Sequence, residues 1–386
     1  MFGRDPAPPL RDRNGETARI ADAITRVGPD LQEVARRVHI SVGTVRYRYK
    51  TQILGKGLPV EAQLDYERLG MRSLLAVVRM DRRLAPHADS VMGWMNATCY
   101  LTDHWLVTPT GERLLQLLVP DRLQRQVASL FEDLKALGIF SHADLTSFDS
   151  LRMAPMMTRY FDFDEGSWSY DWSASLPGRA ASPPPHGRAG RADYDALDLR
   201  ILRELSQDAN ASLAGIAASL GMSYRMLQGH NSKHVLRRGL VRSYGIRWMG
   251  SRRHDPRRGG MVVGPRQGYV PLFVLVRDAT RAEKLEVSAM LNRVPFLWHE
   301  AFGTDYWASM YVPVGHYTES LNYLRGFIQE APERARLYTA DPAGSLSLPF
   351  PSQLFDREEK EWQLDPAVVL TEMENLVLRT RVGGAK

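Results

Sequence analysis

The chain has 386 residues, of which 44% are hydrophobic and 24% are charged, and its 50 Lys and Arg residues exceed its 44 Asp and Glu residues by six. This composition is typical of globular proteins, and the length predicts about two to four domains. The single cysteine, Cys99, excludes an intramolecular disulfide framework and a cysteine-rich zinc module. No apolar run is long enough to span a membrane and the polar N-terminus predicts no signal peptide, so we expect a cytoplasmic protein without membrane contact.

The N-terminal part predicts a flexible tail over 1–16 and a winged helix-turn-helix over 17–68. Apolar residues at helical spacing indicate a first helix, and Asp30 is placed to cap the second. Ser41 is placed to cap a third helix over 42–54. We expect this third helix to be the recognition helix of the unit.

The expected recognition helix and its surroundings carry arginines and hydroxyl side chains but no acid. An α-helix fits the major groove of DNA, where arginine pairs with guanine and threonine contacts the thymine methyl group. Lysine suits phosphate contacts. The alternative is a helix-turn-helix that serves only packing or dimerisation. The residues expected to contact DNA in this unit are Arg36, Arg37, Ser41, Thr44, Arg46, Tyr47, Arg48 and Lys50.

Residues 71–160 predict a ferredoxin-like domain, with strands and helices in the order βαββαβ. The segment 73–80 has the apolar run of a buried strand, and 121–138 has the spacing of an amphipathic helix. An extension and a linker rich in Pro, Gly and Arg follow over 161–192. These features predict a domain boundary near the middle of the chain.

The second half predicts the same series of units. A second winged helix-turn-helix is expected over 193–249, a basic loop or arm over 250–268, and a second ferredoxin-like domain over 269–349. A C-terminal extension over 350–386 contains a helix that Asp365 is placed to cap.

The sequence around the third helix of the second helix-turn-helix also contains basic residues but no Asp or Glu. Gln and Asn suit adenine, and arginines of a flexible arm suit a minor groove. A glycine interrupts this helix, so a packing role is the alternative, and the arm could equally be a plain loop. The residues expected to contact DNA here are Ser223, Tyr224, Arg225, Gln228, Asn231, Lys233, Arg252 and Arg253.

The two halves are related by an internal duplication. Residues 31–58 align without gaps on residues 213–240, at an offset of 182. A weaker similarity relates 161–168 to 355–362, at an offset of 194. Two diverged copies of one two-part unit explain this conserved order.

The segments 40–48, 54–70 and 197–223 resemble the Lrp/AsnC family of bacterial and archaeal transcription regulators. The resemblance implies an α+β fold with two copies of a winged helix-turn-helix followed by a βαββαβ ferredoxin-like domain. It implies a sequence-specific regulator of transcription that binds double-stranded DNA, is not an enzyme, needs no cofactor and responds to a small-molecule effector at the α/β domains. It also implies a homodimer, or a pseudo-dimer formed inside one chain.

Two rival functions remain. The architecture also resembles siroheme decarboxylases, in which fused two-copy chains bind a tetrapyrrole through the α/β part, and the segments 161–168 and 355–362 carry a faint similarity to them. The basic recognition helices favour the regulator over this enzyme. A nonspecific architectural DNA-binding protein is the other alternative. The residues that would serve the enzyme are His104, Arg113, His299, Tyr306 and Trp307.

One further pattern bears on metal binding. His230 and His234 are four residues apart and could ligate a metal from one face of a helix. The glutamate of a zinc-protease motif is missing between them, so phosphate contacts are the favoured interpretation and no metal site is expected.

Overall fold

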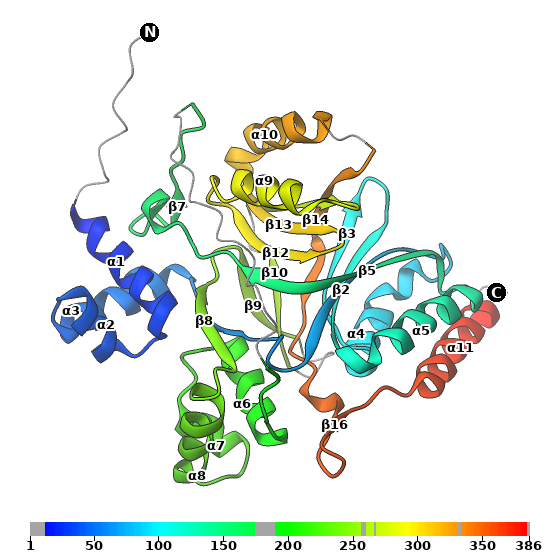
Figure 1. Ribbon diagram of the computed structural model, residues 1–386, viewed down its shortest axis with the longest axis horizontal. Coiled ribbons are helices and arrows are strands. Elements are labelled where there is room, and N and C mark those ends of the chain that lie inside the picture. The colour runs from blue at the N-terminus through cyan, green and yellow to red at the C-terminus, as the bar shows by residue number, and fades with distance from the viewer. Residues whose placement is uncertain (1–11, 174–189, 256–259, 266–267, 331–332, 384–386) are drawn as a thin grey trace.

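The computed structural model has the α+β fold that the sequence predicts (Figure 1). It describes residues 12–173, 190–255, 260–265, 268–330 and 333–383. Parts of the expected tail, linker and basic arm lie outside the described residues, namely 1–11, 174–189, 256–259 and 266–267.

The first helix-turn-helix consists of α1 (Asp12–Val27), α2 (Leu31–Val38) and α3 (Val42–Arg48). The two predicted caps are present, because Asp30 accepts hydrogen bonds from two backbone amides of α2 and Ser41 accepts one from Thr44 at 3.1 Å. Local side-chain chemistry therefore sets the start of both helices.

The helix α1 begins inside the tail expected over 1–16. Glu16 forms an ion pair of 2.6 Å with Arg48 of α3, and Thr17 is fully buried. These contacts hold the first turns of α1 against the recognition helix, so the ordered structure starts earlier than the polar composition predicts.

The second helix-turn-helix consists of α6 (Ala196–Gln207), α7 (Leu213–Ser219) and α8 (Tyr224–His230). Both recognition helices are shorter than predicted, since each passes into a π-helical turn. These turns are Tyr49–Ile53 and Asn231–Leu236, at equivalent places in the two halves. A π turn widens the helix and shifts the side chains that follow it.

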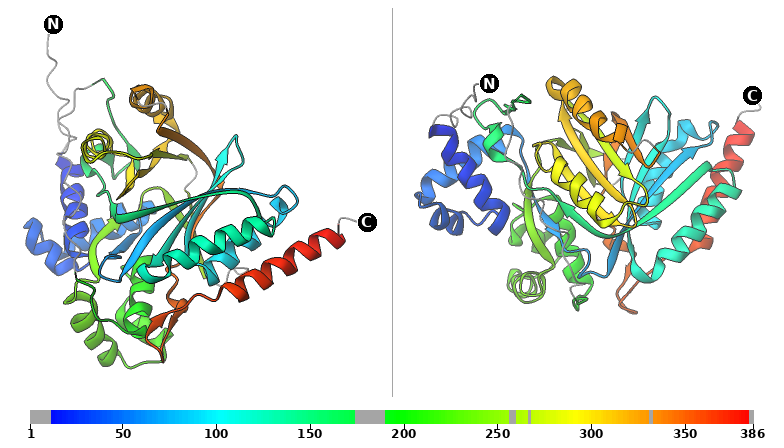
Figure 2. Two further views of the ribbon diagram at one scale, coloured as in Figure 1. Left: turned by 45° about the vertical axis from the view of Figure 1, so that its right-hand side comes forward. Right: turned by 45° about the horizontal axis from the view of Figure 1, so that its top comes forward.

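Each α/β unit has the predicted order βαββαβ. The first contains β2 (Met71–Met80), α4 (Ala88–Thr98), β3 (Leu101–Thr108), β4 (Arg113–Pro120), α5 (Gln124–Ala136) and β5 (Phe140–Met153). The second contains β11 (Tyr269–Val276), α9 (Arg281–Leu291), β12 (Leu297–Gly303), β13 (Tyr306–Pro313), α10 (Tyr317–Glu330) and β14 (Ala335–Ser347). Figure 2 shows α9 and α10 covering the outer face of one unit and α4 and α5 that of the other.

The two units share one continuous sheet, because β5 and β14 each pair with strands of both halves. Strand β5 pairs first with β2 and then with β12, and β14 pairs first with β11 and then with β3. The order β11-β13-β12-β5-β2-β4-β3-β14 is closed by the β11–β14 pairing. The ring encloses an apolar core in which Phe273 stacks on Trp307 with ring centroids 5.1 Å apart. The chain thus forms a pseudo-dimer internally, and an additional homodimer stays a prediction.

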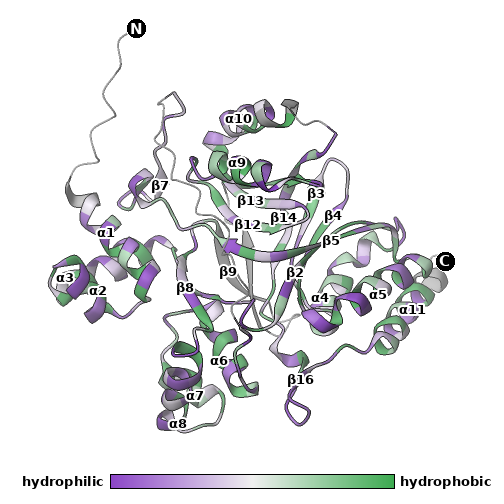
Figure 3. Ribbon diagram, in the orientation of Figure 1, coloured by the Kyte–Doolittle hydropathy of each residue, from purple (hydrophilic) through white to green (hydrophobic). Residues whose placement is uncertain are grey.

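The helix-turn-helix units are attached crosswise. Strands β1 (Val60–Leu64) and β8 (Val241–Ile246), which follow the two recognition helices, pair antiparallel with each other. The first helix-turn-helix shares a buried apolar cluster with the second α/β unit, and the second shares another with the first. Figure 3 shows hydrophobic and hydrophilic residues alternating along the helices and strands.

The similar segments of the two extensions form small matching hairpins. Strands β6 (Phe161–Asp162) and β7 (Ser167–Trp168) pair in the first half, and β15 (Phe355–Asp356) and β16 (Glu361–Trp362) pair in the second. Each hairpin packs on the opposite half, where the Trp168 indole donates to the Tyr269 hydroxyl at 3.1 Å and the Trp362 ring meets the Tyr100 ring edge-on, with centroids 6.0 Å apart. The extensions therefore tie the halves together.

Two segments complete the fold. Helix α11 (Pro366–Gly383) begins after Asp365, as predicted, and contacts α5 (Figure 1). The expected basic arm is a strand pair, β9 (Gly250–Asp255) with β10 (Gly260–Pro265), and β10 pairs with β14. Arg252 and Arg253 lie on β9 opposite Val263 and Val262. The expectation of a loop is wrong for these residues, because strand pairing satisfies their backbone amides and carbonyls.

The crosswise packing predicts a large loss of stability for Trp168→Ala. Trp168 packs on Trp248 and Phe296 of the opposite half, and its removal should lower the free energy of unfolding by about 3–5 kcal/mol in urea denaturation. Tyr47→Ala is the control, since that ring is 67% exposed and its loss should change stability by less than about 0.5 kcal/mol. A cost as small for Trp168 as for Tyr47 would refute the packing argument.

Candidate functional site

The recognition helices present part of the expected DNA-contacting set to solvent. Arg46, Tyr47 and Lys50 are exposed on and after α3. On α8 and the π turn behind it, the exposed residues of the set are Tyr224, Arg225, Gln228 and Lys233. Exposed aromatic rings beside arginines form a surface that could meet a polyanion.

Most of the other expected DNA contacts whose side chains the structure describes are paired with, or packed against, other residues of the protein. Arg48 is turned inward, with a side chain only 17% exposed that pairs with Glu16, so its expected place on the exposed face is wrong. Arg36 and Arg37 both pair with Glu33. Ser41 and Ser223 cap their helices, because each side chain accepts a hydrogen bond from a backbone amide. The Thr44 hydroxyl lies 2.9 Å from that of Ser41. Asn231 is half-buried in the π turn.

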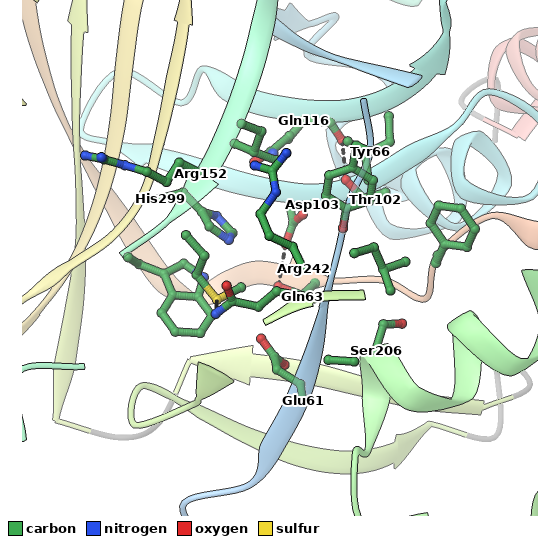
Figure 4. A pocket seen from close by; sticks show the side chains of 18 of the residues that line it. Glu61, Gln63, Tyr66, Thr102, Asp103, Gln116, Arg152, Ser206, Arg242 and His299 are labelled. Carbon is green, nitrogen blue, oxygen red and sulfur yellow. Dashed lines mark hydrogen bonds between the residues drawn. The ribbon is translucent and has the colours of Figure 1, made fainter. Parts of the chain in front are cut away.

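A pocket of about 180 Å³ lies where the two halves meet (Figure 4). Its walls come from β1 and β8, from β3, β4 and β5 of the first unit, and from β12 and β14 of the second. Because these strands meet only through the cross-pairing of the halves, neither half alone could build it. The polar lining residues are Glu61, Gln63, Thr102, Asp103, Gln116, Arg152, Ser206, Arg242, Ser243, Arg247, His299 and Ser347.

The lining has three arginines and two carboxylates, and each arginine is paired with a carboxylate of the protein. Arg247 pairs with Glu61 at 2.5 Å, and Glu61 is only 4% exposed. Arg242 lies 3.2 Å from Asp65, outside the lining. The guanidinium of Arg152 extends away from the pocket (Figure 4) and is paired with Glu300.

Two polar atoms in the pocket lack partners in the protein. His299 Nδ1 and Gln116 Oε1 are buried and have no hydrogen-bond partner among the described residues. Buried polar atoms are almost always hydrogen-bonded, so such a pair in a pocket indicates a place for a ligand or water. Burial and the nearby Arg247 lower the pKa of His299 from its ordinary 6.5 to about 3. Its imidazole is therefore neutral at pH 7, with one ring nitrogen that donates a hydrogen bond and one that can accept a hydrogen bond or ligate a metal.

Asp103 and His299 occupy equivalent positions in the two halves. Asp103 pairs in register with Ser347, the last residue of β14, and His299 with Met153, the last residue of β5. Burial raises the pKa of the Asp103 carboxyl above its ordinary value, while its hydrogen bond with Ser347 opposes the rise. The pocket thus combines an acid of raised pKa with a neutral imidazole, an arrangement suited to proton transfer.

Sequence reasoning found only a part of this pocket. Of the residues named for the rival enzyme, only His299 lines it. The Tyr306 hydroxyl donates to Glu300 at 2.7 Å, and Trp307 lies inside the ring of strands. His104 is buried, and Arg113 is half-buried. Glu61 and Arg247 were missed. A charged residue within an apolar strand could have indicated each of them, because such a residue is rarely buried without a partner.

Comparison with known proteins gives structural matches alone. No protein-family model matches the chain, and no curated protein matches it in sequence. Two solved structures of the siroheme decarboxylase NirDL, one with an iron-uroporphyrin III analogue, are 12% identical to it. They cover 93% and 84% of this chain and 99% and 90% of theirs, with TM-scores of 0.49 and 0.48. Escherichia coli AsnC is also 12% identical and covers 39% of this chain and 99% of its own, with a TM-score of 0.30.

These findings correct one expectation from the sequence. A protein that is not an enzyme was expected, but the two structures that cover most of the chain are those of an enzyme, whereas AsnC covers little more than a third. The expected order of a helix-turn-helix followed by a βαββαβ unit is present in both halves of the structure. Among the described helices, none is both long and apolar enough to cross a membrane.

The buried ion pair in the pocket predicts a strong effect of Glu61→Gln. The change leaves Arg247 without its charged partner, and breaking such a pair costs about 3 kcal/mol in urea denaturation. Glu132→Gln is the matched control, because it removes an exposed pair with Lys135 and should change stability by less than about 0.5 kcal/mol. Equal costs for the two variants would contradict a buried, coupled pair.

The lowered pKa of His299 predicts a pH-dependent stability. Between about pH 3 and pH 6.5 the unfolded chain binds a proton at His299 that the folded chain does not, so stability rises with pH in this window and is lost on acidification. His299→Gln should flatten this part of the curve of unfolding midpoint against pH. An unchanged slope would show that His299 is protonated in the folded protein as easily as in the unfolded chain.

Proposed function

We propose that this chain is an enzyme that binds a carboxylated tetrapyrrole at the pocket between its halves and removes a carboxyl group, as the name siroheme decarboxylase describes for NirDL. The observation that carries the proposal is the neutral imidazole of His299, with a buried Nδ1 that has no partner among the described residues, in a pocket that also contains Asp103 and arginines. This set can bind a carboxylate and move a proton.

Binding is assigned to the arginines of the lining. Arg242 and Arg247 approach the pocket from β8 and the residue after it, and guanidinium groups bind carboxylates through paired hydrogen bonds. The pocket of about 180 Å³ is smaller than the roughly 300–1,000 Å³ that drug-sized ligands occupy. It therefore suits the carboxylate side chains of a larger ring rather than the whole ring.

The proton is assigned to the acid and the imidazole. Decarboxylation breaks the bond to the carboxyl carbon, releases CO₂ and leaves an electron pair on the side-chain carbon, which then takes a proton. Asp103, with its raised pKa, can supply that proton, and neutral His299 can relay it.

The test is to titrate the purified protein with iron-uroporphyrin III and then to incubate it with siroheme. We expect a saturable shift of the Soret band and products that are lighter by the mass of CO₂. Arg242→Ala should weaken binding by roughly ten-fold or more, because a charged hydrogen bond is lost. His299→Ala should reduce turnover, whereas His142→Ala, at an exposed position on β5, should change neither. If the wild-type protein shows no shift of the Soret band and releases no CO₂, the proposal is overturned.

We infer a second capacity, binding of double-stranded DNA, from the exposed faces of α3 and α8. Tyr47 and Tyr224 are 67% and 50% exposed beside Arg46 and Arg225, so each helix presents an aromatic ring and a cation to solvent at equivalent places. This capacity is compatible with catalysis at the pocket, since the two places share no residue.

Two neighbouring arginines provide the test of DNA binding. Arg46→Ala should weaken binding to duplex DNA by about 1–3 kcal/mol if Arg46 reads bases, or lower the salt slope by about one if it contacts phosphate. Arg48→Ala should leave affinity unchanged and destabilise the first helix-turn-helix instead, because Arg48 faces Glu16. Fluorescence anisotropy at several salt concentrations measures both. Equal losses for the two variants would contradict the orientation of α3.

A further inference from the structure

A compact group of metal-ligating side chains lies in the second helix-turn-helix, away from the pocket. Asp195 and Asp198 stand at the start of α6, and His230 and His234 stand at the end of α8 and in the π turn that follows it. One ligand atom from each of the four lies within 4.8 Å of all the others. The histidines therefore face α6. They do not point outward, as the expected contacts with phosphates would require.

The two separations to Asp198 are close to those between the ligands of a tetrahedral metal site, and the other separations in the group are longer. His230 Nδ1 lies 3.4 Å from Asp198 Oδ1 and 3.9 Å from Asp195 Oδ2, and His234 Nδ1 lies 3.3 Å from Asp198 Oδ2. An ordinary N–H···O bond spans about 2.7–3.2 Å. Ligands about 2.0–2.2 Å from a tetrahedral Zn²⁺ are about 3.3–3.5 Å from one another.

The two carboxylates are held in place before any metal binds. Asp195 Oδ1 accepts hydrogen bonds from the amides of Leu197 and Asp198, and Asp198 Oδ2 accepts one from the amide of Asp195. This capping box fixes both side chains and directs their other oxygens, Asp195 Oδ2 and Asp198 Oδ1, towards His230. A preorganised ligand set reduces the entropy lost on binding.

Charge and access also favour a cation. Asp198 is fully buried, and a buried carboxylate needs a positive partner. The side chains of His230 and His234 are 26% and 31% exposed, and that of Asp195 is 44% exposed, so an ion can reach the group from solvent.

The first half offers an internal comparison. At the offset of 182, His230, His234 and Asp198 correspond to Arg48, Gln52 and Glu16. There the guanidinium of Arg48 itself supplies the positive charge, through its 2.6 Å ion pair with Glu16 and a 3.1 Å hydrogen bond to Gln52. The second half has imidazoles at the positions of Arg48 and Gln52.

We propose that Asp195, Asp198, His230 and His234 form a Zn²⁺ site that fastens α8 and its π turn to α6. Both histidines ligate through Nδ1, and the ion takes the place that the Arg48 guanidinium holds in the first half. The site is structural, since four protein ligands complete a tetrahedral shell.

The test is to remove metal from the purified full-length protein with a chelator and to titrate it with Co²⁺. We expect one equivalent per chain, with the intense visible absorption of tetrahedral Co²⁺, and displacement of that absorption by Zn²⁺. The His230→Ala/His234→Ala double variant should lose the bound equivalent, measured by elemental analysis after dialysis. His142→Ala, which changes an exposed histidine in the first α/β unit, should retain it.

A second variant keeps the test decisive if the double variant fails to fold. Asp195→Asn preserves the helix cap, because asparagine caps helices as well as aspartate does, but it removes the charged ligand. It should bind Co²⁺ more than roughly ten-fold more weakly. No tetrahedral Co²⁺ spectrum in the wild-type protein, or equal binding by the wild-type protein and Asp195→Asn, would overturn the proposal.

Discussion

The structure depends on two strands that are too long for their own domains. Strands β5 and β14 have 14 and 13 residues, and each pairs with its own half before continuing into the sheet of the other. This exchange closes the ring of strands, buries its aromatic core and brings β1 against β8. It also creates the pocket, which is lined by residues from both halves. Any change that separates the halves therefore removes the fold and the candidate site together.

The features that sequence predicts best are those set by neighbouring residues. Asp30 and Ser41 cap their helices because a side-chain oxygen meets an amide two or three residues later, and the order of strands and helices follows from apolar spacing. The π turns after α3 and α8 were missed because they maintain the helical apolar spacing. The exchange of β5 and β14 was missed because pairing partners distant in sequence leave no local pattern.

The candidate site was harder to predict for the same reason. His299 was named through a family resemblance, but Glu61 and Arg247 come from strands that meet only through the β1–β8 pairing, more than 180 residues apart in sequence. The recognition helices show the opposite error. Their basic composition is visible in the sequence, yet composition does not tell which arginine faces outward, and Arg48 faces Glu16 instead.

The repeat of matching elements within one chain allows both candidate sites to be asymmetric. In a pseudo-dimer every position occurs twice, so one copy can keep the packing role while the other acquires new chemistry. Asp103 and His299 are such a pair, with an acid of raised pKa on one side of the pocket and a neutral imidazole on the other. A symmetric dimer of a shorter chain would place two acids or two imidazoles there, and two identical groups cannot act as unlike partners in a proton transfer without first differing in protonation. Fusion of the halves into one chain removes that restriction, because each member of the pair can change independently.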